Sequence, residues 1–503
     1  MPDLAAAIAV VTLAYCVFVF DGGTQLFRDS DSGWHIRSGE WILAHHSLPR
    51  EDPYSFSRAG QPWFAWEWGA DVLMGLAHRI DGLRGVTALF ALAICASAWM
   101  WFRLHFAAGG DFLIACLLAP PAITTTSLHW LARPHVFSWL FLLGGLWCCE
   151  RATVRFGHRQ LAAVAAVTAL WANLHASFFL APVIALVYAV SHLIRPWLWP
   201  VDPQPERAKA LWFVWAALAA LAGSLLNPYG WRLHAHIFSY LRNDALLSRV
   251  AEFQSFNFHD PGAIQVAVAV GVAAAGGTLA LTQGKIAHFL LAAMFVFGAL
   301  RAARMLPLLA LSILPLANGA FAEALAGARS LRPRLQRAID AVLGYSARLR
   351  AIDQRLNGVA FTATAVMVVL AAMRAPAFSH DFGFPSNTFP VAAADAVARL
   401  PVAARLAAPD NFGGYLIYRF NEGRFNGARK VYFDGRSDFY GVDFMKQYLV
   451  LINARPGWRE IQRSYHFTHA LLPEASALKA ALEQAGWIIL YKDDVATLLA
   501  EAH

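Results

Sequence analysis

The sequence predicts a polytopic α-helical membrane protein with a smaller α/β domain at its C-terminal end. Of the 503 residues, 58% are hydrophobic and only 15% are charged, whereas soluble domains carry about 25% charged residues. Apolar runs long enough to cross a bilayer recur as far as residue 375. After residue 376 charged residues become frequent and the apolar runs shorten.

The apolar runs predict about eleven transmembrane helices, because a span needs roughly 17–25 apolar residues. The first run has neither a basic n-region nor a clear cleavage site, so we expect a retained helix rather than a signal peptide. We therefore predict a transmembrane domain over residues 1–375. Its helices are expected at residues 4–20, 85–106, 111–128, 134–150, 160–174, 177–195, 208–226, 262–282, 286–301, 303–320 and 357–375.

The distribution of arginine predicts the orientation of these helices. Cytoplasmic loops collect Lys and Arg, and the densest basic run of the chain lies within residues 321–356. With this run in the cytoplasm, the N-terminus is cytoplasmic too, and the first outer loop, 21–84, lies on the opposite face with 121–133 and 227–261. The basic run is also typical of an amphipathic helix at the membrane interface.

Residues 376–503 alternate between helical and strand patterns, which predicts an α/β domain of normal size on the outer side. Helices are expected near 390–400, 440–453, 457–464 and 475–485. Strands are expected at 404–408, 414–420, 430–434, 468–472, 486–491 and 495–499.

The most unusual stretch lies in the first outer loop, at residues 27–68, where acids and rings gather between two apolar runs. An aromatic belt with snorkelling arginines explains the rings and the basic residues, but it does not explain the acids. We interpret this loop as half of an active site. Its ionisable residues are Asp29, Asp31, His35, Arg37, Glu40, Glu51, Asp52 and Glu67.

Asp31, with Asp29 beside it, offers the clearest chemistry in this loop. Such a carboxylate can accept a proton, bind a divalent cation or orient a sugar hydroxyl. Indole faces can stack on sugar rings, although interfacial belts use the same side chains. The tryptophans of the loop are Trp34, Trp41, Trp63, Trp66 and Trp68.

Other outer segments contribute further candidates. Arg301 and Arg304 flank a short outer turn and suit a lipid-linked phosphate or pyrophosphate; snorkelling is the alternative. Glu252 lies in the outer segment 227–261, from which it could reach the first outer loop. Basic and imidazole side chains on the same face are His129, Arg133, His135 and His175.

Several classes of protein are disfavoured. The net charge is +8, yet the apolar content makes a nucleic-acid partner a poor interpretation. The five cysteines lie in apolar runs without a pairing pattern, so we expect neither disulfides nor a metal site from them. The long runs contain almost no charges and no inverted repeat, which weighs against a transporter.

The segment Asp31-Ser-Gly-Trp-His-Ile-Arg37, with Leu48-Pro-Arg-Glu-Asp-Pro-Tyr-Ser55 after it, resembles the first outer loop of oligosaccharyltransferase catalytic subunits, which are GT-C-fold glycosyltransferases. A looser resemblance to bacterial membrane proteins related to that fold covers nearly the whole chain. Its motifs are Asp29-Ser-Asp-Ser-Gly-Trp-His35, Trp66-Glu-Trp68, Arg133-Pro-His135, Ala172-Asn-Leu-His175, Asn227-Pro-Tyr-Gly230 and Asp434-Gly-Arg436.

This resemblance implies a GT-C-like membrane domain, a periplasmic domain and a polyprenyl-linked sugar donor. It implies that Asp31, with Asp29, binds a divalent cation (Mg²⁺ or Mn²⁺) and contacts the acceptor, and that Glu252 lies near the acceptor. The chain departs from the family at 121–133, which lacks the second acidic pair and offers His129 and Arg133 instead. The residues expected to bind substrate are Trp34, His35, Arg37, Glu67, Arg133, His175, Arg301 and Arg304.

We therefore expect a glycosyltransferase of the bacterial inner membrane, with membrane lipids around it. It would move a sugar from a polyprenyl-phosphate or -pyrophosphate donor to a periplasmic lipid, glycan or protein acceptor. The alternative is a non-catalytic scaffold or glycan-binding component of envelope polysaccharide assembly, which the missing acidic pair favours.

Overall fold

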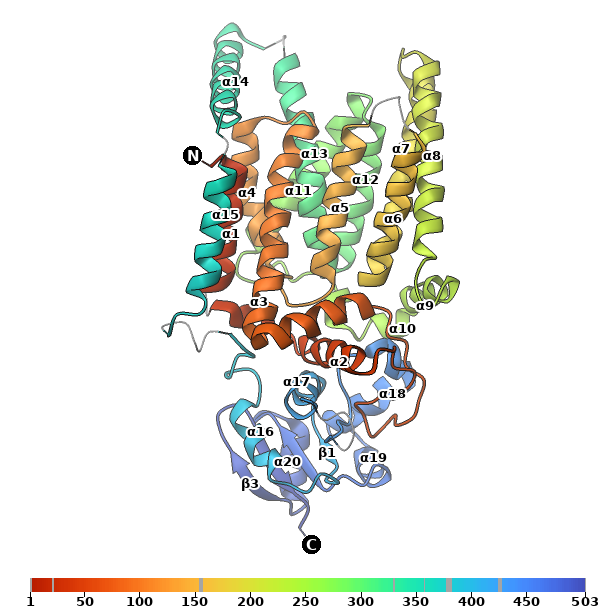
Figure 1. Cartoon of the computed structure of the whole chain (residues 1–503), viewed down its shortest axis with the longest axis vertical. Coiled ribbons are helices and arrows are strands. Elements are labelled where there is room, and N and C mark those ends of the chain that lie inside the picture. The colour runs from red at the N-terminus through yellow and green to blue at the C-terminus, as the bar shows by residue number, and fades with distance from the viewer. Residues whose placement is uncertain are drawn as a thin grey trace.

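The computed structural model describes residues 2–19, 22–152, 157–328, 331–356, 358–376, 382–423 and 428–502. The described chain is mostly helical, and it forms two layers (Figure 1). A bundle of long helices stands on a smaller layer that contains the sheet and the C-terminus.

The helical bundle and the short helices at its lower end come from the first three quarters of the chain. The α-helices are α1 (Leu4–Phe18), α2 (Asp31–His45), α3 (Trp68–Ala107), α4 (Phe112–Ser127), α5 (His135–Glu150), α6 (His158–Leu174), α7 (Leu180–Leu198), α8 (Pro203–Ser224), α9 (Trp231–Leu241), α10 (Asp244–Leu247), α11 (Ala263–Thr282), α12 (Ile286–Arg301), α13 (Leu306–Gly327), α14 (Pro333–Asp353) and α15 (Val359–Ala372). The 3-10 turns are η1 (Gly22–Phe27), η2 (Ala176–Phe179), η3 (Ala251–Phe253) and η4 (Ala303–Met305).

Each apolar run predicted to cross the membrane coincides with one of these helices. Five of the helices, α1, α4, α5, α12 and α15, are apolar but shorter. The number of about eleven crossings therefore stays a prediction. By length and composition, four segments of the described chain can cross a membrane: Trp68–Ala107, Ala176–Leu198, Ala263–Thr282 and Ala303–Gly327.

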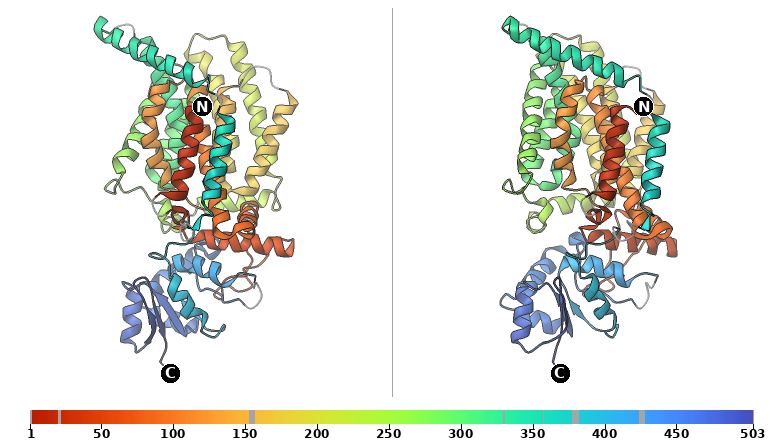
Figure 2. Two further views of the ribbon diagram at one scale, coloured as in Figure 1. Left: turned by 60° about the vertical axis from the view of Figure 1, so that its left-hand side comes forward. Right: turned by 90° about the vertical axis from the view of Figure 1, so that its left-hand side faces the viewer.

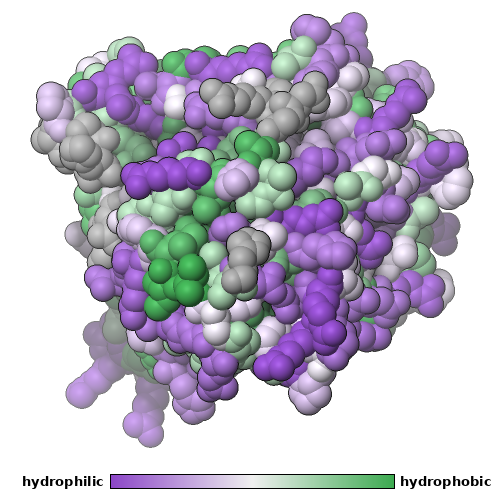
Figure 3. Space-filling view, turned by 90° about the horizontal axis from the view of Figure 1, so that it is seen from below, coloured by the Kyte–Doolittle hydropathy of each residue, from purple (hydrophilic) through white to green (hydrophobic). Residues whose placement is uncertain are grey.

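Burial separates a packed core from an apolar rim. Residues 306–320 of α13 are almost all buried, so this helix lies at the centre of the bundle. On the rim, the exposed fractions of Leu117, Trp197 and Phe297 are 74%, 85% and 69%. The face of the smaller layer is largely hydrophilic (Figure 3). Large exposed apolar surfaces mark contact with lipid or protein, which agrees with a multi-pass membrane protein.

The helix α2 lies across the lower end of the bundle, between the two layers (Figure 1). It packs against α3 on the bundle side and against α17 (Asp410–Phe420) of the smaller layer. A Cβ atom at Gly33 would lie 2.3 Å from the carbonyl oxygen of Gly414, so only glycine permits this approach. The first residue of α2, Asp31, is therefore placed at the junction of the layers.

The smaller layer surrounds a four-stranded sheet of order β1-β2-β4-β3. β1 runs parallel to β2, with Leu406 opposite His469, and the other pairs are antiparallel. The strands are β1 (Leu406–Ala407), β2 (His469–Leu472), β3 (Ile488–Lys492) and β4 (Thr497–Ala500). The remaining helices are α16 (Val391–Ala398), α18 (Ser437–Ile452), α19 (Trp458–Ser464) and α20 (Ala477–Gln484).

Two of the predicted strands are wrong. Residues 414–420 belong to α17, and residues 430–434, all of them described, contribute only an isolated bridge from Val431 to Ser55. The tyrosines and Ile417 favour a strand locally. Packing overrides that preference, because a helix buries Phe412 and Leu416 on one face.

The arginine-rich run forms α14, which projects from the end of the bundle opposite the sheet (Figures 1 and 2). α15 then returns alongside α1 (Figure 2). Arg155 and Arg329, which belong to the predicted cytoplasmic loops, lie outside the described residues, as do 377–381 after the predicted domain boundary. The cytoplasmic and periplasmic sides and the boundary at 376 stay predictions.

Candidate active site

A cavity of about 780 Å³ lies where the bundle meets the smaller layer. This volume is within the usual range for a small-molecule site, roughly 300–1,000 Å³. Segments far apart in the sequence line it: the start of α2, the turn before α5, the end of α6, the η3 and η4 turns, and residues 410–411 and 435–438.

The first outer loop supplies two carboxylates to this cavity. Asp31 opens α2 and is 7% exposed. Its backbone N–H donates to Oδ1 of Asp29 at 2.9 Å, which holds the two acids side by side. On the other side, Gly435 leaves room for the Asp31 carboxylate, because a Cβ there would lie 1.9 Å from its Oδ1 atom.

Arg133 crosses the cavity wall to meet both acids. One of its terminal nitrogens donates to Oδ2 of Asp29 at 2.7 Å, and the other lies 2.9 Å from Oδ2 of Asp31. Glu252 lies 3.7 Å from Arg133 and 3.1 Å from Arg304. Three carboxylates and two guanidinium groups thus alternate along one wall.

The charges shift the acidity of these carboxyl groups in opposite directions. Burial raises the pKa of Asp31 to about 7, although the charge of Arg133 opposes this rise. Burial also raises the pKa of Glu252, but Arg304 and Arg133 outweigh it and lower that pKa to about 2. Of Asp31 and Glu252, it is therefore Asp31 that titrates near neutral pH.

Glu67 lies at the N-terminus of α3 and lines the cavity between two histidines. Its carboxylate oxygens lie 3.4 Å from Nε2 of His175 and 3.7 Å from Nε2 of His35. Burial raises the pKa of Glu67 to about 8. Behind it, Nδ1 of His35 lies 2.6 Å from Asp71, and Nδ1 of His175 lies 2.9 Å from Ser138 Oγ.

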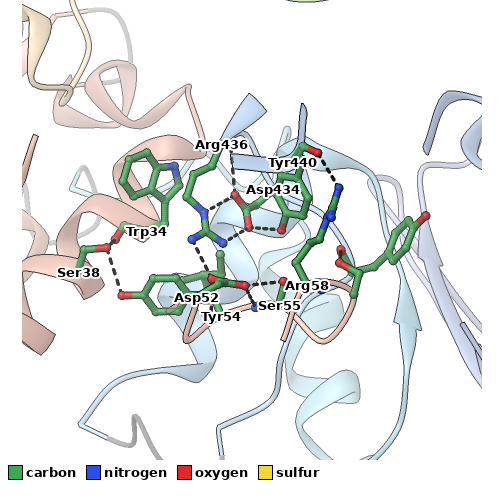
Figure 4. A network of polar contacts seen from close by, with 12 residues as sticks. Trp34, Ser38, Asp52, Tyr54, Ser55, Arg58, Asp434, Arg436 and Tyr440 are labelled. Carbon is green, nitrogen blue, oxygen red and sulfur yellow. Dashed lines mark hydrogen bonds and ion pairs between the residues drawn. The ribbon is translucent and has the colours of Figure 1, made fainter. Parts of the chain in front are cut away.

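Arg436 ties the first outer loop to the smaller layer (Figure 4). Its guanidinium bonds Asp434 through two nitrogens, at 2.8 and 2.7 Å, and Asp52 of the loop at 2.8 Å. The Tyr440 hydroxyl donates to Asp434 at 2.7 Å. Arg436 and both carboxylates are buried, and Arg436 also lines the cavity. This network fixes one wall of the site.

The cavity brings together most of the residues that the sequence singles out. His35 is buried behind Glu67 rather than in the wall. Arg37 is buried too, where it donates to the Tyr418 carbonyl at 2.7 Å, away from the cavity. The predicted residues that line the cavity are Asp29, Asp31, Trp34, Trp63, Trp66, Glu67, His129, Arg133, His135, His175, Glu252 and Arg304.

The predicted pair of phosphate-binding arginines is separated in the structure. Arg304 lines the cavity with a side chain that is 28% exposed. The side chain of Arg301 is 70% exposed and lies outside the cavity lining, where a terminal nitrogen is 3.6 Å from Asp244. Of these two arginines, only Arg304 can therefore meet a ligand in this cavity.

The sequence does not indicate that several of the residues lining the cavity belong to a functional site. Asp410 and Asp438 belong to the predicted α/β region, which gives no hint that it closes the site. Arg436 lies in the Asp434-Gly-Arg436 motif, so its importance could be read from the sequence, but not its partner Asp52. Tyr240 is a further aromatic residue of the lining that the sequence does not single out.

The side chains at this cavity do not fit the divalent cation (Mg²⁺ or Mn²⁺) that the resemblance implies. Both carboxylates assigned to it, Asp29 and Asp31, turn an oxygen to Arg133. Across the residues that the structure describes, no three His, Cys, Asp or Glu side chains converge as ligands. The five cysteines are free, and all lie elsewhere in the chain.

Comparison with known proteins gives a fold rather than a close relative. No protein-family model matches the sequence, and no curated protein matches it. Among solved structures, the oligosaccharyltransferase of Archaeoglobus fulgidus in the apo form aligns over 93% of this chain and 69% of its own, with a TM-score of 0.53 and 11% identity. The chain has a GT-C fold.

Two further structures align with the chain. The archaeal oligosaccharyltransferase AglB from Archaeoglobus fulgidus, in complex with an inhibitory peptide and a dolichol-phosphate, gives a TM-score of 0.54 at 11% identity, with 93% of this chain and 69% of that chain covered. ArnT from Cupriavidus metallidurans, bound to undecaprenyl phosphate, covers 99% of this chain and 97% of its own at 12% identity, with a TM-score of 0.41.

Proposed function

We propose that this protein is a membrane glycosyltransferase that takes a sugar from a polyprenyl-phosphate or -pyrophosphate donor. The observation that carries this proposal is the cavity, which a buried carboxylate, Asp31, and a cationic group, Arg304, both line at the end of an apolar helix bundle. The AglB structure with a dolichol-phosphate supports a lipid-linked donor.

The cavity lining suits both ends of such a donor. Apolar side chains from bundle helices, Leu180, Met294 and Leu308, can contact the lipid chain. Arg304 would bind the phosphate, because a guanidinium offers two parallel N–H donors to phosphate oxygens. Trp34 and Trp66 would pack against the sugar.

The reaction balances with Asp31 as the base. The acceptor hydroxyl attacks the anomeric carbon, its proton passes to the Asp31 carboxylate, and a new C–O bond forms. The bond from the anomeric carbon to the phosphate oxygen breaks, and the polyprenyl phosphate leaves with the electron pair. Arg304 would stabilise the charge that develops on this phosphate. The acceptor is proposed to be an envelope lipid, glycan or protein on the periplasmic side of a bacterial inner membrane.

The test compares envelope glycans by mass spectrometry in strains that depend on the wild-type gene or on Asp31→Asn. Loss of one glycan species in the variant strain supports the proposal. An unchanged glycan profile, with variant protein present at the wild-type level in the membrane, contradicts it.

The pKa of Asp31 predicts how the transfer rate depends on pH. The ionised form accepts the proton, and a raised pKa means that this form is lost as the pH falls below about 7. The rate should therefore fall about tenfold per pH unit well below that value and level off above it. The measurement is product formation in isolated membranes across a pH series. A rate that declines as the pH rises through neutrality contradicts this assignment.

Gly435→Ala should displace the catalytic carboxylate without unfolding the chain. The new methyl would lie 1.9 Å from Oδ1 of Asp31, so we expect transfer to fall by about tenfold or more. Gly271→Ala in α11, where nothing lies within 4 Å of the added Cβ, is the matched control. The product is measured as above, with melting temperature as the check on folding. Equal activities of the two variants would show that Gly435 does not position the Asp31 carboxylate.

A second candidate is a non-catalytic scaffold that binds lipid-linked glycans. The pairing of Asp29 and Asp31 with Arg133 favours it, because an internal ion-pair network can be purely structural. In that case the Asp31→Asn strain contains the same glycans as the wild type, and the purified protein binds a polyprenyl-phosphate sugar without turnover.

A further inference from the structure

We infer that the guanidinium of Arg133 takes the place of a divalent cation at this site, so that the protein holds its carboxylates ready without metal. This inference rests on the proposed function, but its main test does not depend on catalysis. The geometry of the wall carries it.

The contacts of Arg133 are those that a bridging cation would make. Its two terminal nitrogens reach Asp29 at 2.7 Å and Asp31 at 2.9 Å, and Glu252 lies 3.7 Å away. A divalent cation joins carboxylates from separate segments in the same way, through hard oxygen ligands. Here a fixed side chain joins the first outer loop to the loop before α11.

The backbone beside Arg133 is held in place, which fixes the position from which its side chain reaches the two acids. The Ala132 N–H donates to the Leu26 carbonyl at 2.7 Å. The Ala132 carbonyl accepts from Ser32 Oγ at 3.0 Å, in the first turn of α2. The residue before Arg133 is thus bonded to η1 and to α2, the elements that flank Asp29.

Electrostatics oppose a metal in the presence of Arg133. Three carboxylates, Asp29, Asp31 and Glu252, face two guanidinium groups, Arg133 and Arg304. An added divalent ion would meet the charge of Arg133 at close range, where a partly buried site screens the repulsion poorly. Removing Arg133 leaves the three acids facing one guanidinium group, Arg304, around an open position.

The experiment measures Mn²⁺ binding to the purified full-length protein in detergent by electron paramagnetic resonance. We expect no stoichiometric binding by the wild type. Arg133→Gln should gain about one Mn²⁺ per chain, which Asp31→Asn in the same background should abolish. Arg304→Gln is the matched control, because it removes the same charge from the same wall but leaves Asp29 and Asp31 paired.

The outcomes separate the inference from its alternatives. Stoichiometric Mn²⁺ on the wild type that is lost in Asp31→Asn overturns it, as does an Arg133→Gln variant that folds and binds none. Equal Mn²⁺ binding by Arg133→Gln and Arg304→Gln overturns it too, because net charge alone would then explain the gain. If Arg133→Gln does not fold, Arg133→Met provides a second neutral variant, and the wild-type titration decides the case where neither folds.

A second arm tests catalysis. In isolated wild-type membranes, EDTA should change the yield of the glycan product by less than about twofold. A loss in EDTA that Mn²⁺ restores contradicts the inference. Absence of any product would refute the proposed function and leave the Mn²⁺ titration as the measure of the role of Arg133.

Discussion

Replacing Asp31 with Asn should reduce sugar transfer by about 10²–10⁴-fold, the usual contribution of a general base. The amide keeps the shape of the side chain but cannot take the proton of the acceptor hydroxyl. The site would otherwise stay intact, because Asp29 still accepts from Arg133 at 2.7 Å and Glu252 still pairs with Arg304 at 3.1 Å. The measurement is product formation in membranes that contain equal amounts of each protein.

Two controls make this result specific. Asp443→Asn alters an aspartate whose side chain is 92% exposed in the smaller layer, and it should leave the rate unchanged within about twofold. Binding of a polyprenyl-phosphate sugar by the Asp31→Asn protein should persist, because the phosphate is assigned to Arg304. A variant that keeps its rate within about tenfold of the wild type shows that Asp31 is not the base.

Arg436→Ala should lower the free energy of unfolding by about 3–5 kcal/mol, because it leaves Asp52 and Asp434 buried without a counter-charge. Both carboxylates lie within 2.8 Å of the guanidinium, and all three side chains are almost fully buried. The loss also frees the first outer loop from the smaller layer. Thermal unfolding in detergent should therefore show a midpoint that is lower by roughly 3–5 °C.

The matched control is Arg463→Ala, which removes an arginine from the same layer. Its side chain is 72% exposed and pairs at 3.7 Å with Glu460, so the free energy of unfolding should change by about 0.5 kcal/mol or less. Arg436→Lys should give an intermediate loss, because an ammonium group keeps the charge but cannot make the bidentate contact. If Arg436→Ala and Arg463→Ala have the same unfolding midpoint, the buried network does not stabilise the contact between the two layers.

The helices could be predicted from the sequence, whereas the contacts of the site could not, and the reason is physical. A helix that spans a bilayer needs a long run of apolar side chains, and such runs leave a strong local pattern. Every predicted run accordingly coincides with a helix. In residues 414–420 the local pattern is misleading, because the contact of α17 with α2 decides the outcome. The Arg436–Asp52 pair joins residues 384 positions apart, and no local pattern encodes such a partner.

The sequence by itself determined that the chain is an apolar helical protein with an acidic, aromatic loop, and that Asp31 is the residue of that loop to test. The tertiary structure decided what Asp31 faces. It placed Arg133 where a cation was expected, separated Arg301 from Arg304, and closed the cavity with residues 435–438. Composition and periodicity are properties of neighbouring residues, whereas charge pairing in a cavity depends on which distant segments the fold brings within a few ångströms.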